Sequence, residues 1–414
     1  MNPDYPRKTR CVQRSPLHLV IPLVLCAGTL VLLVSCAIPA HLERTVADIK
    51  ARMLPDSGTP VQSGVSASAL LNRLFLPLVR YDSPVYLPYV KKDVPTPTPT
   101  STPTSTPTHT PTRTPTPTFT PRPVGYPPPY STSYYLSTTN YDTLYRLGQS
   151  VGASILPAQD VIIFLDFGQP WYENGSWGSI IFGSLEFRSI SQLTTAVQAF
   201  CRGYYINSPT DAHLTLAIGT SNYGRSYEFV SHEHGVAWAQ MVNWLNTWIG
   251  SPPSWASKIK IAGAIDAEPG WNTAGRTRAW AEGFDSAISS GVYYNFGSCD
   301  SCPFAACPTC RILNGWTYED IWYISWGVRT AFTVPEIYLV SGVNADQWHR
   351  VSLYAWNAHG QAIRYSGAMT QYVSCQQKGC TTNTPSQGWL QLFDYLNSDP
   401  RTAYTPRWST DIRW

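Results

Sequence analysis

The run Ile259-Lys260-Ile261-Ala262-Gly263-Ala264-Ile265 is followed directly by Asp266-Ala267-Glu268. The first seven residues are almost wholly apolar without a clean alternation, which predicts a β-strand covered on both faces. Side chains two positions apart in an extended chain point to the same side, so Asp266 and Glu268 are expected to share one side. This stretch therefore predicts a buried strand that ends in a pair of carboxylates.

Runs of similar character alternate with helical patterns along the chain. Strong strand-like runs lie at 161–165, 214–218 and 321–325, and weaker ones at 134–136, 292–294, 336–339 and 363–365. Helical patterns lie at 142–152, 191–204, 234–249, 276–289, 345–356 and 387–397. This alternation over about 250 residues predicts an α/β domain with a (β/α)8 TIM-barrel-like fold, with an open doubly wound sheet as the alternative. No Gly-x-Gly-x-x-Gly motif follows the first strand, so a dinucleotide-binding fold has no direct support.

Polar and aromatic side chains follow most of the expected strands. The active sites of such barrels lie at the carboxyl ends of the strands, which makes these positions candidates for the site. As catalytic groups we select Asp166, Asp266 and Glu268. As substrate-binding groups we select the other polar or aromatic residues near strand ends, namely Gln169, Trp171, Asn222, Tyr223, Trp271, Asn295, Trp326 and Gln371.

The chemistry of the acidic pair favours glycoside hydrolysis. Mutual repulsion and poor hydration are expected to raise the pKa of one of the two carboxyl groups. A carboxylic acid that stays protonated near neutral pH can protonate the leaving oxygen of a glycosidic bond. Glu268 is the candidate proton donor, Asp266 would tune it or act on the anomeric carbon or a water, and Asp166 would be a third acid. The structural alternative is that these acids cap helices or pair with Arg276 or Arg278.

A first strand ending in Asp166-x-x-Gln169 and a later strand ending in Asp266-x-Glu268 resemble family 25 glycoside hydrolases, the lysozyme-like barrels that cleave peptidoglycan. The pattern is also similar to the glycoside-hydrolase-like barrel domains of bacterial surface proteins, many without proven activity. In family 25 the matching acids line the catalytic pocket, which implies the same role for these three acids. The family continues its first strand as Asp-Val-Ser, and this chain departs from that pattern at residues 167–168.

Tryptophan is abundant, and all 16 tryptophans lie after residue 125. Sugars present apolar C–H faces that stack on indole rings, so this abundance supports a glycan ligand. Trp171, Trp271 and Trp326 follow expected strand ends and are candidate sugar platforms. The tryptophans within helical patterns are expected to pack in the core.

The cysteines of the expected barrel are candidates for disulfides rather than ligands of a metal. Six of them are disulfide candidates: Cys299, Cys302, Cys307, Cys310, Cys375 and Cys380. The first four also allow a zinc hypothesis, but their two Cys-x-x-Cys pairs are separated by only four residues, which leaves little room to fold one knuckle over the other. Cys375 and Cys380 are expected to close a small loop of their own, and the odd count leaves one thiol, Cys201, free and buried.

The segment His232-Glu233-His234 opens an expected helix after Ser231, where polar caps are common. It differs from the zinc motif His-Glu-x-x-His, and we therefore expect no metal site and no cofactor. The sequence contains no Gly-x-Ser-x-Gly motif and no recognisable Cys/His dyad, so hydrolysis by a serine or cysteine nucleophile has no motif to support it.

The first 125 residues are expected to direct export of the protein and to hold the folded domain at a distance from the membrane. Residues 1–36 resemble a signal peptide that ends in a bacterial lipobox, with Cys36 as the lipidated residue; an uncleaved membrane anchor and cleavage near Ala40 are the alternatives. Residues 37–93 form a short spacer with a repeated Leu-Pro-x-Val element. Residues 94–125 form a Thr/Pro-rich disordered linker, and residues 126–414 form the glycosidase-like barrel domain.

The charge balance argues against a nucleic-acid partner. Residues 126–414 contain 16 Lys/Arg and 20 Asp/Glu, a net charge of −4, whereas phosphate binding requires a basic excess. The sequence favours an extracellular, monomeric glycoside-hydrolase-like protein that acts on peptidoglycan or polysaccharide. It would be secreted or held at the cell surface through a membrane lipid or anchor. The alternative is a non-catalytic barrel that binds glycan or protein at the cell surface.

Overall fold

The computed structural model describes residues 126–223, 227–251 and 253–414. The predicted signal peptide with Cys36, the spacer and the Thr/Pro-rich linker lie outside the described residues. Within the described part of the chain, no helix is long and apolar enough to cross a membrane.

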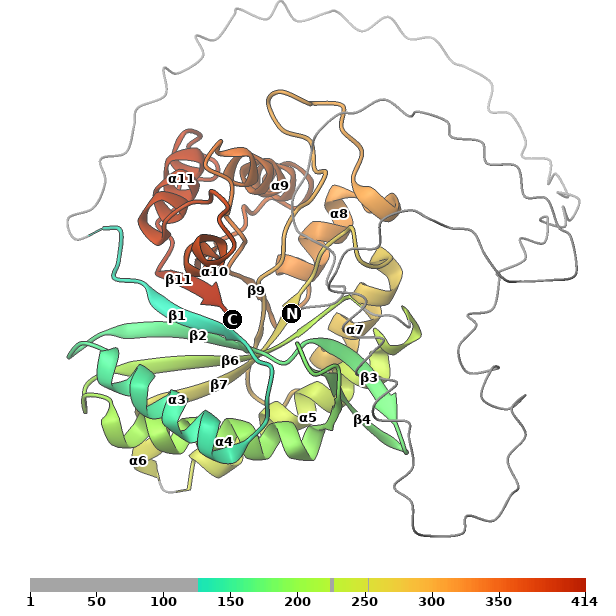
Figure 1. Ribbon diagram of the computed structural model, residues 1–414. Coiled ribbons are helices and arrows are strands. Elements are labelled where there is room, and N and C mark those ends of the chain that lie inside the picture. Colours follow the sequence, from blue (N-terminus) through green and yellow to red (C-terminus); the bar gives the residue numbers. More distant parts are fainter. Residues whose placement is uncertain (1–125, 224–226, 252) are drawn as a thin grey trace, which may run out of the picture. The chain divides into compact units, whose positions relative to one another are not determined.

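Eight parallel strands form the centre of the molecule (Figure 1). In chain order they are β1 (Ser131–Tyr135), β2 (Asp160–Asp166), β6 (His213–Ser221), β7 (Ile259–Asp266), β8 (Tyr293–Asn295), β9 (Ala331–Thr333), β10 (Gly367–Thr370) and β11 (Trp408–Arg413). Each strand pairs with the next one in the chain from β1 to β9, and β10 pairs with β11. The last strand returns to the first, with Thr410 opposite Ser131.

The remaining gap, between β9 and β10, is bridged just beyond the end of β9. The Ile337 N–H donates to the Met369 carbonyl at 2.8 Å, and the Met369 N–H donates to the Pro335 carbonyl at 2.9 Å. These bonds form an isolated parallel bridge between Glu336 and Met369. The sheet is therefore a nearly closed barrel whose strands follow one another in chain order, which confirms the predicted (β/α)8 TIM-barrel-like fold.

Helices connect successive strands and cover the barrel. They are α3 (Tyr141–Ser154), α4 (Ile190–Asn207), α5 (His232–Ile249), α6 (Pro253–Ala256), α7 (Ala274–Ala287), α8 (Tyr318–Trp322), α9 (Val343–His359), α10 (Tyr372–Gln377) and α11 (Pro385–Asn397). All six predicted helical patterns are confirmed, each within three residues of the observed ends. Between β2 and α4 the chain adds a small antiparallel sheet of β3 (Gln169–Glu173), β4 (Ser176–Ile180) and β5 (Phe187–Ser189).

The core has two layers because the strands are buried on both faces. One cluster lies between the strands and the helices and includes Ile163, Leu216 and Ile261. The other fills the barrel interior and includes Phe164 and Ala262. Since neighbouring residues of a strand point to opposite faces, an apolar run without alternation supplies both clusters at once.

The strand predicted at 321–325 is wrong. This run belongs to α8 and to the π-helical turn Tyr323–Gly327 that continues it. The Thr317 hydroxyl accepts the Asp320 N–H, and the Asp320 carboxylate accepts the Thr317 N–H, which is the reciprocal cap that starts a helix. The sixth strand of the barrel is instead the shorter β9. Of the weaker runs, 336–339 contributes only the bridge at Glu336, and 363–365 precedes β10.

The predicted disulfides are confirmed within the described residues. Cys299 pairs with Cys302, Cys307 with Cys310, and Cys375 with Cys380. Cys201 in α4 is free and buried, as predicted. Disulfides of this kind are typical of proteins that function in an oxidising environment outside the cytoplasm.

Candidate active site

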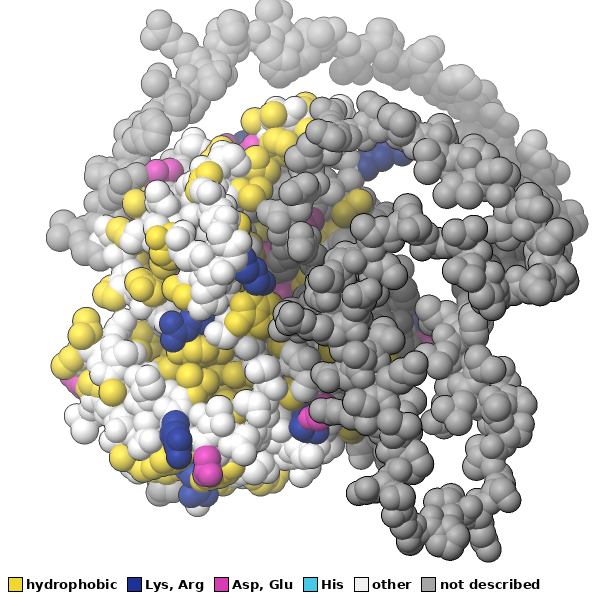
Figure 2. Space-filling view, in the orientation of Figure 1, with side chains coloured by type: hydrophobic (Ala, Val, Ile, Leu, Met, Phe, Trp, Pro, Cys, Tyr) yellow, Lys and Arg dark blue, Asp and Glu magenta, His cyan; other side chains and the backbone are white. Residues whose placement is uncertain are grey.

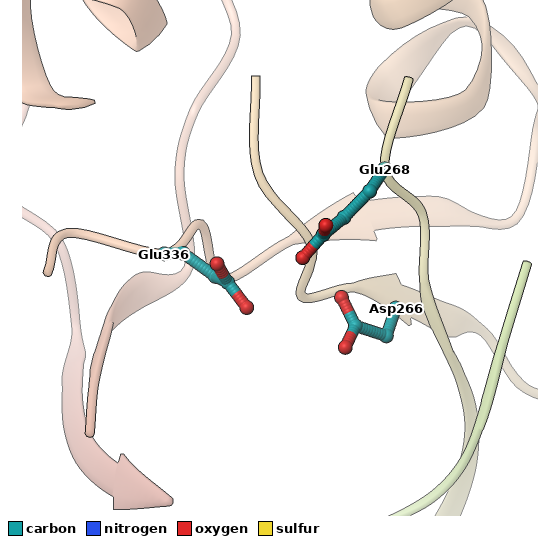
Figure 3. A group of neighbouring side chains, drawn as sticks. All are labelled: Asp266, Glu268 and Glu336. Atoms are coloured by element: carbon teal, nitrogen blue, oxygen red, sulfur yellow. The ribbon is translucent and has the colours of Figure 1, made fainter. Parts of the chain in front are cut away.

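Three carboxylates meet at the carboxyl end of the barrel (Figure 3). Asp266 is the last residue of β7, Glu268 follows two positions later, and Glu336 lies in the segment that follows β9. Each offers an oxygen, and these three oxygens all lie within 4.8 Å of one another. All three residues are buried, with exposed fractions of 1%, 1% and 2%. The predicted acidic pair is therefore joined by a third acid from the segment that follows β9.

Asp266 faces the barrel interior because of the alternation along β7. Ala262 and Ala264, four and two positions earlier, belong to the interior cluster, and residues two apart in a strand share a side. The Asp266 carbonyl accepts the Asn222 N–H at 3.0 Å, so the neighbouring chain from β6 holds the end of β7. The carboxylate of Asp266 therefore lies on the interior face of β7, directly after the apolar residues of that face.

Asn222 positions Glu268. Its side-chain carbonyl accepts the Glu268 N–H at 3.0 Å, and its amide donates to the Glu268 carbonyl at 3.0 Å. The same amide donates to the Thr277 hydroxyl at 3.1 Å. Asn222 was predicted to bind substrate, but its amide is engaged with the protein and the residue is fully buried. It holds the backbone of the predicted proton donor in place.

Glu336 was not selected from the sequence. The run 336–339 was predicted as a strand that begins at Glu336, whereas the structure puts this residue beyond the end of β9. Val334 and Tyr338 flank it by two positions and belong to the interior cluster, so Glu336 faces the interior as well. The Tyr338 hydroxyl donates to Glu336 Oε1 at 2.8 Å. The alternation Val334-x-Glu336-x-Tyr338 was the signal that could have revealed it.

Asp166 stands at the same end of the barrel, as the last residue of β2, and is fully buried. Its Oδ1 accepts the Gly168 N–H at 3.0 Å. Gly168 has a φ of +95°, a conformation that favours glycine in the turn after β2. In register Asp166 is opposite Gly219 of β6, whereas Asp266 is opposite Ser221. One strand therefore separates Asp166 from the three clustered carboxylates.

Four of the predicted binding residues lie near the acids in the chain or in contact with a residue that does. The Trp271 N–H donates to the Glu268 carbonyl at 3.1 Å, which fixes Trp271 next to the proton-donor candidate. Its ring meets the Tyr223 ring edge to face, with centroids 5.7 Å apart. Gln169 begins β3, and Trp171 in the same strand packs against Phe229 at 4.8 Å. These two belong to the small sheet that follows Asp166 in the chain.

The other three predicted binding residues have different surroundings. The Asn295 side-chain carbonyl accepts the Gly297 N–H at 3.1 Å, and its amide donates to the Ser325 hydroxyl at 2.9 Å. Trp326 precedes β9 instead of following a strand, because the predicted strand at 321–325 is helical. Trp326 therefore lies toward the amino end of β9, whereas Glu336 lies beyond the carboxyl end. Gln371 follows β10 and occupies the N-cap position of α10, where its side chain forms no capping hydrogen bond.

Among the described residues, the group that could hold a metal ion is Asp266, Glu268 and Glu336. Carboxylate oxygens are ligands of hard cations such as Ca²⁺ and Mg²⁺. His234, in the segment His232-Glu233-His234, is fully buried. Its Nδ1 accepts the Trp280 indole N–H at 2.9 Å, and its Nε2 lies 3.0 Å from the Gly178 carbonyl. Both ring nitrogens are thus engaged within the protein.

Comparison with known proteins gives little further information. No protein-family model matches the chain, and no curated protein matches it. Among solved structures, it is similar to the crystal structure of a β-1,4-D-mannanase from Cryptopygus antarcticus, with 11% sequence identity and a TM-score of 0.35 over 69% of this chain and 84% of that one. The assignment of the barrel rests on the strand order and register of this chain.

Proposed function

We propose that the chain is an extracellular glycoside hydrolase that acts on peptidoglycan or another polysaccharide. The observation that carries this proposal is the group of three buried carboxylates at the carboxyl ends of β7 and β9, with oxygens within 4.8 Å of one another. Glycosidases use a pair of carboxyl groups, one as an acid and one as a base or nucleophile. The neighbouring Trp271 and Tyr223 rings would supply apolar surface for a sugar face.

Glu268 acts as the proton donor and Glu336 as the nucleophile. Carboxyl groups about 5–5.5 Å apart suit attack by one of them on the sugar, whereas inversion needs a wider gap that admits a water. The Glu336 carboxylate bonds to the anomeric carbon as the glycosidic bond breaks, and the Glu268 proton passes to the leaving oxygen. Water then attacks the anomeric carbon and returns a proton to Glu268, which releases the sugar from Glu336. Asp266 holds the Glu268 proton near the leaving oxygen, and the hydrogen bond from Tyr338 favours the ionised form of Glu336.

The test is release of sugar from purified peptidoglycan, chitin, cellulose, mannan and xylan by the full chain. Glu268→Gln and Glu336→Gln keep the shape of each side chain and remove its acid function. Each is expected to lower the rate by about 10²–10⁴-fold. Glu173→Gln is the matched control, because Glu173 is an exposed acid at the end of β3.

One outcome would contradict this function, and another would contradict the roles given to the carboxylates. Binding of a polysaccharide without release by any variant would identify a non-catalytic glycan-binding barrel. Loss of release on chelation, restored by Ca²⁺ or Mg²⁺, would instead assign the three carboxylates to a metal site. Activity on a β-linked substrate with retained anomeric configuration, followed by NMR, supports the nucleophilic role of Glu336.

The location of the protein is a separate proposal. We propose that Cys36 is lipidated and tethers the barrel to a membrane through the Thr/Pro-rich segment 94–125. Mass spectrometry of the membrane fraction tests this, with Cys36→Ser as the control. A membrane-bound Cys36→Ser protein that keeps residues 1–35 would identify an uncleaved anchor, and a freely secreted parent protein would refute both forms of tether.

A further inference from the structure

A second concave surface lies on the helical layer, away from the carboxylates. It is formed by α3, α4 and α6, which lie side by side on one flank of the barrel (Figure 1). Its volume is about 420 Å³, within the range of small-ligand sites. We call it the aromatic groove, and its lining residues are Tyr141, Asp142, Tyr145, Arg202, Ile206 and Trp255.

The aromatic rings of the groove are partly exposed and held in place. The Tyr141 and Tyr145 rings are nearly parallel, with an interplanar angle of 7° and centroids 6.4 Å apart. Tyr141 is 42% exposed. Trp255 stacks on Tyr205 with centroids 4.8 Å apart and meets Trp248 edge to face at 5.2 Å. The groove therefore presents flat apolar faces whose orientation is set before any ligand arrives.

Two charged side chains border these rings. Within the described part of the chain, neither Asp142 nor Arg202 forms a hydrogen bond or an ion pair through its side chain. The Arg202 guanidinium lies 5.5 Å from the centroid of the Trp248 ring, which orients it beside the groove. The groove thus offers a hydrogen-bond acceptor at Asp142 and a donor at Arg202 in addition to its aromatic faces.

The scaffold beneath the groove is tightly packed. A Cβ added at Gly203 of α4 would lie 2.0 Å from the Tyr145 carbonyl oxygen of α3, and one added at Gly148 would lie 2.1 Å from the Phe200 carbonyl oxygen. Two helices that approach this closely cannot shift without losing contact. The spacing between the rings on α3 and the charged group on α4 is therefore fixed by the fold, as a preformed binding surface requires.

We propose that the aromatic groove is a second binding site for carbohydrate, separate from the carboxylate group. Sugar rings carry an apolar C–H face that stacks on Tyr and Trp, and their hydroxyl groups both donate and accept hydrogen bonds, as Arg202 and Asp142 require. Charged side chains of both signs lie among uncharged ones on the face that carries α3 and α4 (Figure 2), so a polymer with hydroxyl groups can find polar partners there without carrying a charge of its own. The site does not depend on the carboxylates being catalytic.

The Thr/Pro-rich segment 94–123 of this chain is the rival occupant, because proline-rich segments dock in aromatic grooves. Ten of the thirty residues of this segment are proline, which lacks a backbone N–H, so a third of its positions cannot donate a backbone hydrogen bond to Asp142. The pairing of an acceptor with a donor in the groove therefore favours a carbohydrate over this segment.

The test measures binding of the full chain carrying Glu268→Gln to chitin beads, cellulose and peptidoglycan, by depletion from solution. Tyr141→Ala and Asp142→Ala are each expected to weaken binding to at least one of these polymers about fivefold, because the first removes an aromatic face and the second a hydrogen-bond acceptor. Trp244→Ala is the matched control, since Trp244 is 50% exposed in α5 but does not line the groove. Its binding is expected to equal that of the parent.

Short soluble oligosaccharides separate this site from the catalytic one. With Glu268 intact, Tyr141→Ala is expected to cleave them at the parent rate while it binds the polymer more weakly. If no variant has activity, the binding measurement still tests the groove. Equal binding by the parent and by both groove variants would overturn the proposal, and so would binding of a synthetic peptide of residues 94–123 that Tyr141→Ala abolishes while polymer binding is unchanged.

Discussion

His234 is a buried histidine whose neutral form is required by its hydrogen bonds. The Trp280 indole N–H donates to Nδ1, so Nε2 carries the ring proton and donates to the Gly178 carbonyl. The ring joins α5 to α7 and to β4 of the small sheet. Complete burial lowers the pKa of His234 from 6.5 to about 4. Protonation of Nδ1 would break the bond from Trp280 and place a charge in the core.

Stability is therefore expected to fall as the pH falls through a defined window. The unfolded histidine takes up a proton near pH 6.5, whereas the folded one resists it until about pH 4. Between these values the unfolded state binds more protons, so acidification favours unfolding. A pKa lowered from 6.5 to about 4 corresponds to about 3 kcal/mol of stability that is present at pH 7 and lost by pH 4.

Urea unfolding followed by tryptophan fluorescence at pH 7, 5.5 and 4 measures this loss. His234→Gln is the comparison, because glutamine offers one donor and one acceptor but does not titrate. The variant is expected to be less stable than the parent at pH 7, and to lose about 3 kcal/mol less on the way to pH 4. Other groups titrate equally in both proteins and cancel. An identical pH dependence in parent and variant, or titration of His234 near pH 6.5 by NMR, would refute the reasoning.

Three further predictions concern packing and position. Asn222→Ala removes the bonds that hold Glu268 and should lower kcat about 10²-fold with little change in KM, in steady-state assays on a cleaved polymer. Gly203→Ala should destabilise the protein by about 1–3 kcal/mol in urea, because its Cβ would meet the Tyr145 carbonyl oxygen at 2.0 Å, and an unchanged midpoint would contradict the close packing. Burial raises the pKa of the Cys201 thiol far above its usual range, so Ellman's reagent should label it only after unfolding, and rapid labelling of the native protein would show that α4 opens.

The strands that the sequence predicts well are those with apolar residues on both faces. The runs 161–165, 214–218 and 259–265 supply apolar side chains both to the barrel interior and to the layer between strands and helices. Each run lies within an observed strand. The run at 321–325 has the same composition but follows a reciprocal helix cap at Thr317 and Asp320, and local capping decides its structure. Short strands such as β9 leave no periodic pattern to detect, since three residues are too few.

Part of the candidate site could be predicted from local sequence, and part depends on contacts that only the folded barrel makes. Asp266 and Glu268 were found because they continue a strong strand by two-residue alternation. Glu336 was not, because Pro335 interrupts its segment and its strand pairs only through a bridge to β10. Its position next to the acidic pair depends on barrel closure, a contact between distant parts of the chain that spacing cannot reveal.

The buried amides show that a polar residue at a strand end can have a structural role beside a candidate site. Asn222 and Asn295 both follow strands and both could bind a sugar hydroxyl. The side-chain carbonyl of each accepts a backbone N–H, and the side-chain amide of each donates to another group of the protein. A loop that leaves a parallel strand has backbone groups without partners in the ladder, and a buried amide satisfies one donor and one acceptor together. The acids, by contrast, lie on the interior face of β7 and of the segment after β9. Substitution of an amide should therefore disturb the site through the backbone that the amide holds, and substitution of an acid should disturb it mainly through the loss of charge at the site.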